Sequence, residues 1–146
     1  DGDEDIFEVI GGAYPGDTYQ SVLFENPGHG NHWVSLELRG VQSNASAIGA
    51  RVRLRVETKT GTRDLFRSVG AVSSFGGSPF RLHIGVGEAT TIKELEIRWP
   101  ASGKTQRWQG LQSDRFYSIA EDASMPSTIA RKPFAFAKAS SPAHHH

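Results

Sequence analysis

The sequence SNASAIGARVRLRV, residues 43–56, predicts a polar turn, a corner of small residues and a β-strand in direct succession. Its last six residues alternate between charged and apolar, which is the period of a strand with one face buried and the other in water. Gly49 suits a corner where the backbone needs a positive φ or a close approach, and Ser43 and Asn44 can form the side-chain bonds that begin a turn. The stretch therefore predicts the entry into a central strand.

Similar alternation recurs at regular intervals on both sides of this stretch. We expect strands at residues 6–10, 19–25, 33–39, 51–58, 63–69, 80–87, 92–99, 105–109 and 116–120. Turns rich in Gly, Ser, Asn and Pro separate these segments, and no segment has a helical period. Trp99 shares a strand face with two aliphatic residues and is expected in the core. The pattern predicts an all-β fold, an antiparallel β-sandwich of the jelly-roll type.

Length and composition bound the class of protein. A chain of 146 residues is long enough to bury roughly 70% of the surface that its unfolded form exposes, and therefore to fold without a disulfide or a structural metal. Its 16 basic and 16 acidic residues cancel, which argues against nucleic acid as a partner. The absence of cysteine rules out thiol chemistry. No apolar stretch reaches the roughly 20 residues of a membrane span.

Several short motifs carry a resemblance to a known family. In chain order they are Asn31-His32-Trp33, Gly40, Ser43-Asn44, Ala47-Ile48-Gly49-Ala50-Arg51-Val52, Leu82-His83-Ile84-Gly85-Val86-Gly87, and Trp99-Pro100 followed by Ser102-Gly103. Together they resemble the ASPIC/UnbV domain, a module at the C-terminus of FG-GAP/VCBS-type β-propeller proteins such as the cartilage acidic protein family. The resemblance implies a non-enzymatic accessory module, with an interaction or structural role, in a protein that is extracellular, periplasmic or at the cell surface.

The resemblance also implies a division of the chain. Residues 1–26 look like the end of an FG-GAP/VCBS-like repeat, and residues 27–122 look like the sandwich module. Residues 123–146 are rich in Ser, Pro, Ala and Lys, a composition that favours an extended or disordered tail. The last three residues are histidines, which is typical of a purification tag.

Carboxylates occupy alternate positions at the start of the chain, at Asp1, Asp3 and Asp5. Acidic residues two apart in a loop that leads into a strand can converge on calcium, which takes six to eight oxygen ligands. The alternative is an acidic terminus with no ligand. The resemblance implies calcium, because propeller repeats of this type carry an Asp-x-Asp-x-Asp-Gly loop whose ligands these three aspartates would be.

Two sets of side chains are candidates for contact with a ligand or a partner. Arg53 and Arg55 project from one face of the central strand and could bind a sulfated glycan or a phosphate, unless carboxylates on neighbouring strands neutralise them. Trp108 lies between Arg107 and Gln109, and Trp33 and Phe66 lie in or beside loops and outward faces. A flat ring with polar neighbours is what a sugar-binding sandwich uses, although such rings are also common in cores and domain interfaces.

Trp33, with the hinge at residues 26–31, is expected to pack against the adjacent β-propeller domain or another protein. A polysaccharide bound by exposed aromatic rings is the alternative. Catalysis is not predicted, because the spacing provides no nucleophile with a base and no pair of poised carboxylates. His29 and His32 flank Gly30 and Asn31 and are expected to be turn and hydrogen-bonding residues rather than metal ligands.

Overall fold

The computed structural model describes residues 4–12, 14, 16, 20–70, 77 and 79–132. Within these residues the chain forms ten β-strands and no helix. The strands are β1 (Ile6–Glu8), β2 (Val22–Phe24), β3 (His32–Arg39), β4 (Arg51–Thr58), β5 (Gly61–Ser68), β6 (Leu82–Gly87), β7 (Thr91–Arg98), β8 (Thr105–Gln112), β9 (Arg115–Ala120) and β10 (Ser127–Ile129). The expectation of an all-β fold is confirmed.

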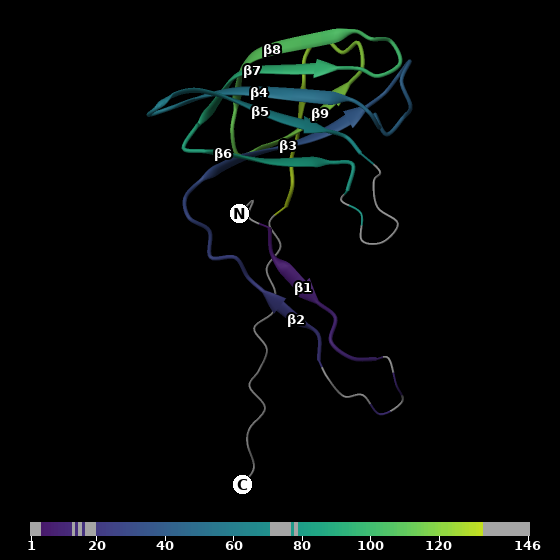
Figure 1. Ribbon diagram of the computed structural model, residues 1–146, viewed down its shortest axis with the longest axis vertical. Helices are drawn as coiled ribbons and strands as arrows, with labels where there is room; N and C mark the ends of the chain where they lie inside the picture. The colour runs from purple at the N-terminus through teal and green to yellow at the C-terminus, as the bar shows by residue number, and fades with distance from the viewer. Residues whose placement is uncertain are drawn as a thin grey trace.

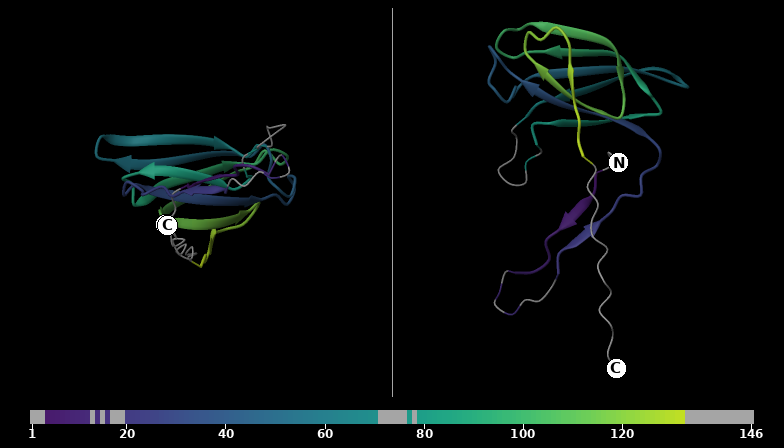
Figure 2. Two further views of the ribbon diagram at one scale, coloured as in Figure 1. Left: turned by 90° about the horizontal axis from the view of Figure 1, so that it is seen from below. Right: turned by 180° about the vertical axis from the view of Figure 1, so that it is seen from behind.

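Eight of these strands form two four-stranded sheets that pack as a sandwich (Figures 1 and 2). The strand order is β5-β4-β7-β8 in one sheet, here called the charged sheet, and β10-β9-β3-β6 in the other, here called the aromatic sheet. β1 and β2 form a separate hairpin, which lies away from the sandwich in Figure 1. Both sheets contribute to one apolar core between them.

The alternation read from the sequence matches the burial of the strands. In β4, Val52, Leu54 and Val56 are all at most 2% exposed, while the arginines between them face outward. Full burial of such a side chain contributes roughly 1.5–3 kcal/mol. Trp99 is fully buried, as predicted, and its indole N–H donates to Gln106 Oε1 at 2.5 Å.

The corner before β4 has the geometry that its residues predict. Asn44 closes it with two bonds to Ile48, because its Nδ2 donates to the Ile48 carbonyl and its Oδ1 accepts the Ile48 N–H, each at 2.9 Å. Gly49 has a φ of +93°, which a residue with a Cβ rarely adopts. Gly40 faces a close approach instead, since a Cβ there would lie 2.2 Å from the Asn44 carbonyl oxygen.

The structure departs from the sequence expectations in two strands. β9 runs parallel to β3, so the aromatic sheet is mixed rather than wholly antiparallel. Alternation predicts a strand but not its neighbour, and this pairing is set when the chain crosses from β8 in the other sheet. β10 follows residue 122 and pairs with β9. It was not expected, because Ser127-Thr128-Ile129 is too short and polar to show alternation.

Candidate interaction surfaces

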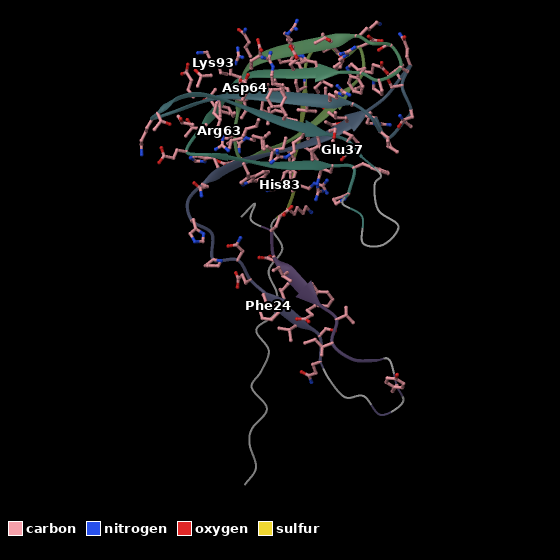
Figure 3. The ribbon with its side chains drawn as sticks, viewed as in Figure 1. Phe24, Glu37, Arg63, Asp64, His83 and Lys93 are labelled. Atoms are coloured by element: carbon pink, nitrogen blue, oxygen red, sulfur yellow. The ribbon has the colours of Figure 1, made fainter. Side chains whose placement is uncertain are left out.

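Arg53 and Arg55 lie on the outer face of the charged sheet, where carboxylates engage both of them. Arg53 Nη2 lies 2.6 Å from Glu94 Oε1 and 3.1 Å from Glu96 Oε2. Arg55 forms a two-point contact with Asp64, with both N···O distances at 2.8 Å. Figure 3 labels Asp64 on this sheet. Each arginine therefore sits in a ladder of opposite charges across β5, β4 and β7, rather than in a free basic stripe.

The Arg55–Asp64 pair shifts the pKa of both groups. The hydrogen bond from Arg55 holds the pKa of the Asp64 carboxyl below its usual range, and the same bond raises the pKa of Arg55. Phe66 lies opposite Arg53 in the register of β5 and β4 and is 66% exposed. The outer face of this sheet thus combines paired charges with the exposed ring of Phe66.

Trp108 lies on the other side of β8, inside the sandwich. Its side chain is 8% exposed and belongs to the core, where Trp108 is opposite Leu95 of β7. The indole N–H donates to the carbonyl of Ser124 at 2.9 Å. This position leaves little of the ring for contact with a ligand, so Trp108 does not join Phe66 on one surface.

Trp33 projects from the outer face of the aromatic sheet and is half-buried. It stacks on His83 of β6, with ring centroids 5.1 Å apart, and meets the edge of Phe116 of β9 at 4.8 Å. Its strand is fixed at the N-terminal end by Asp114, which lies 2.6 Å from Nδ1 of His32 and accepts the Trp33 backbone N–H. His32 is thus a hydrogen-bonding residue, as expected.

Of the three aspartates expected to bind calcium, Asp5 falls within the described residues, and Asp1 and Asp3 lie outside them. The Asp5 carboxylate accepts the backbone N–H of Asn26 at 2.8 Å. It thereby ties the start of the hairpin to its end. Within the described part of the chain, no three His, Cys, Asp or Glu side chains are grouped as metal ligands.

A depression of about 640 Å³ lies beside the end of β4 and the start of β7. Polar and charged side chains line it, among them Glu57, Glu88 and Lys93. Both carboxylates are already engaged, since Glu57 pairs with Lys93 and Glu88 lies 3.1 Å from Lys59 Nζ. Neither carboxylate that lines the depression is therefore left unpaired for a ligand.

Part of the sequence matches the profile of a known protein family. The sequence profile of the ASPIC and UnbV family matches residues 40–126. The chain belongs to the ASPIC and UnbV family. A search of curated proteins gives no match. The matched segment runs from the residue after β3 to the residue before β10, and proteins of this family carry the domain as a module of larger proteins. No helix able to cross a membrane occurs within the described residues.

One buried carboxylate organises this ASPIC and UnbV domain and was missed from the sequence. Glu121 is 2% exposed. Its Oε2 accepts three consecutive backbone N–H groups, from Val41, Gln42 and Ser43, at 2.7–2.8 Å. Its Oε1 accepts the hydroxyls of Ser43 and Ser102 at 3.1 and 2.5 Å. Three segments that are distant in sequence therefore meet at this side chain.

Burial disfavours the charged form of Glu121, but these hydrogen bonds outweigh it and lower its pKa to about 2. A signal for the residue exists in the sequence. Tyr117 and Ile119 face inward, and continued alternation puts Glu121 on the same buried side. An acidic residue at an inward position needs several donors, which the sequence does not identify.

Proposed function

We propose that this chain is a non-enzymatic accessory module that docks, through its β1–β2 hairpin, onto a neighbouring β-sheet domain of the same secreted or surface protein. The observation that carries the proposal is the exposure of apolar side chains on the hairpin. Ile6, Phe7, Val9 and Phe24 are 65%, 64%, 70% and 53% exposed. Figure 3 shows Phe24 on the hairpin, away from the sandwich.

The apolar residues occupy both faces of the hairpin. Ile6 is paired with Phe24, and Phe7 is paired with Leu23. Paired residues share a face and successive residues alternate, so these two pairs lie on opposite faces. A hairpin at the surface of a finished domain keeps one face polar. Apolar residues on both faces support a position inside a larger β structure.

The short length of its strands also supports docking of the hairpin onto another domain. Each strand of the hairpin has three residues, and a two-stranded sheet is at best marginally stable alone in water. Its outer edges present backbone groups that a further strand can pair with. A β-propeller, whose blades are sheets of about four strands, supplies both an edge and apolar faces. Membership of a family whose domain is a module of larger proteins also supports this partner.

Calcium at the start of the chain belongs to the same proposal. Asp5 precedes β1 directly and already links to Asn26, two residues after β2. An ion held by Asp1, Asp3 and Asp5 would brace the base of the hairpin with oxygen ligands. We expect 1 mM CaCl₂ to raise the protection of the hairpin amides from hydrogen exchange relative to EDTA, and to leave the sandwich amides unchanged. Equal protection in both buffers would exclude an ion there.

Hydrogen exchange also tests the docking itself. The Phe7 and Leu23 amides should exchange nearly freely in this chain and become at least about tenfold slower in a longer form that carries the neighbouring domain, because docking removes them from water. The change Phe7→Ser should remove that extra protection. Met125→Ser is the control, since Met125 is 73% exposed on the sandwich.

Two results would contradict docking through the hairpin. One is the same exchange rate for these amides in the short and long forms. The other is equal loss of protection in Phe7→Ser and Met125→Ser, which would make the effect one of general stability rather than of contact.

A further inference from the structure

Three rings from three strands gather on the outer face of the aromatic sheet. They are Trp33 of β3, His83 of β6 and Phe116 of β9, here called the ring cluster. Trp33 lies within about 5 Å of both other rings, measured between centroids, and is tilted 28° from His83 and 61° from Phe116. Figure 3 labels His83 on the lower edge of the sandwich. Side chains from β3, β6 and β9 therefore form one aromatic surface.

A buried hydroxyl lies within the ring cluster. Ser35 is opposite His83 in β6 and opposite Phe116 in β9, and it projects from the same sheet face as Trp33. It is 1% exposed, and its Oγ has no hydrogen-bond partner among the described residues. Buried hydroxyls are nearly always paired, because an unpaired one loses its bonds to water without replacement. Ser35 therefore offers a hydrogen bond that the sandwich does not use.

Two arginines border the same rings. The guanidinium carbons of Arg81 and Arg131 lie 5.8 and 5.4 Å from the centroid of Phe116. Within the part of the chain that the structure describes, neither guanidinium has a hydrogen bond or an ion pair. This contrasts with Arg53 and Arg55 on the charged sheet, which carboxylates engage. Two cations without a carboxylate partner favour an acidic group as the ligand.

Space remains above Gly85 of β6. Gly85 is opposite Trp33 in β6, and a Cβ built on it would meet no atom within 4 Å. The flank of Trp33 over β6 is therefore not covered by a side chain from that position. Glu37, two residues beyond Ser35 on the same face, is half-exposed and supplies an acceptor at the rim. The other nearby carboxylate, Asp114, is bonded to His32.

From these four features we infer that the ring cluster binds an acidic sugar unit of a polysaccharide. The apolar face of the sugar would lie on Trp33, and its carboxylate or sulfate would bond to Arg81 and Arg131. A ligand oxygen would accept the hydroxyl of Ser35 after a small shift of the rings. A protein partner fits less well, because a specific interface buries about 800 Å² per partner and this cluster consists of three rings bordered by charged side chains.

Tryptophan fluorescence of the full chain gives a direct readout. Trp99 and Trp108 are buried, so a ligand at the ring cluster changes the emission of Trp33. The probes are polygalacturonate, which carries carboxylates, and heparin, which carries sulfates. Dextran is the neutral glycan and poly-glutamate the acidic peptide. We expect saturable binding of at least one acidic glycan and none of dextran or poly-glutamate, and the preferred glycan identifies the acidic group.

Paired variants separate the site from general charge. Arg81→Gln/Arg131→Gln should weaken the binding about tenfold or more. Arg63→Gln/Arg67→Gln, which removes two exposed charges from β5, should change it by less than about twofold. Ser35→Ala should weaken binding while raising the melting temperature, because it deletes an unpaired buried hydroxyl. A purely structural role for Ser35 would leave the affinity unchanged.

The inference is overturned if neither acidic glycan binds saturably, if dextran or poly-glutamate binds as well, or if both arginine pairs weaken binding equally. It does not depend on the docking of the hairpin. Phe7→Ser, which tests that docking, should leave glycan binding unchanged, so the two proposals fail separately.

Discussion

Glu121 joins the loop after β3, the turn after β7 and the end of β9 through five hydrogen bonds to one carboxylate. Replacement by glutamine keeps the shape but removes the charge that three backbone N–H groups share. We expect Glu121→Gln to lower the free energy of unfolding by about 1–3 kcal/mol at pH 7, since hydrogen bonds to charged groups are the strong ones. Urea unfolding measures this.

The pH dependence of stability provides a second test at the same residue. The pKa of Glu121 is about 2 in the folded chain and ordinarily about 4.5. A lowered pKa stabilises the fold above pH 4.5, and this stabilisation is lost as the pH falls from 4.5 to 2. In Glu121→Gln that part of the loss should be missing. The control, Asp122→Asn, removes an exposed carboxylate that binds Lys104. This variant should still lose stability between pH 4.5 and 2 as the wild type does. Parallel curves for Glu121→Gln and wild type would contradict the assignment.

Trp108 gives a prediction that separates packing from ligand contact. Trp108→Ala should cost about 3–5 kcal/mol of unfolding free energy, because it leaves a cavity in the core. Trp108→Phe retains a ring and loses the N–H bond to Ser124, so it should cost less. Denaturant unfolding of both variants measures the difference. If Trp108→Ala were as stable as the wild type and bound glycan differently, Trp108 would be a surface residue and not a core residue.

The loop between β3 and β4 (Arg51–Thr58) depends on the close approach at Gly40. A methyl group there would overlap the Asn44 carbonyl, 2.2 Å from the Cβ position, and the loop would have to move off Glu121. We expect Gly40→Ala to destabilise the fold by about 1–3 kcal/mol. Gly85→Ala is the matched control, because its methyl group meets open space. Similar melting temperatures for the two variants would show that the loop accommodates the methyl group without loss of stability.

The two faces of the sandwich differ as elements, although both sheets have four strands. The charged sheet pairs Arg53, Arg55 and Arg107 with carboxylates across strands, and such partly exposed pairs contribute little stability, about 0–1 kcal/mol each, but discourage pairing with other chains. The aromatic sheet leaves Arg81 and Arg131 unpaired beside its rings, within the described residues. Both of these arginines lie against the ring of Phe116, which locates the candidate site on the aromatic sheet.

For the whole molecule, stability should reside in the sandwich and not in the hairpin. The core is built from strands of the two four-stranded sheets, whereas β1 and β2 contribute nothing to it. Deletion of residues 1–26 should therefore leave the melting temperature of the sandwich within a few degrees of the full chain. Circular dichroism on heating measures this. A large fall would mean that the hairpin supports the sandwich directly.

The sequence by itself determined which residues of β4 and β7 face inward. Alternation in β4 and β7 (Thr91–Arg98) places their aliphatic residues in the core. The turn chemistry of Asn44 and Gly49 places the corner before β4. These are local properties, set by the pleat of a strand and by allowed values of φ. The family could be identified from short motifs of the same kind, most of which lie at corners and strand ends.

Only the tertiary structure decided which strands are neighbours, and the candidate site depends on that choice. Alternation does not put Trp108 in the core, since Arg107 and Gln109 flank it and no other apolar residue of its predicted strand shares its face. The ring cluster joins residues 33, 83 and 116, and Glu121 binds a loop that lies about 80 residues earlier in the chain. Long-range pairing brings these groups together, and no local period records it, because a strand's own sequence fixes its faces but not its partner.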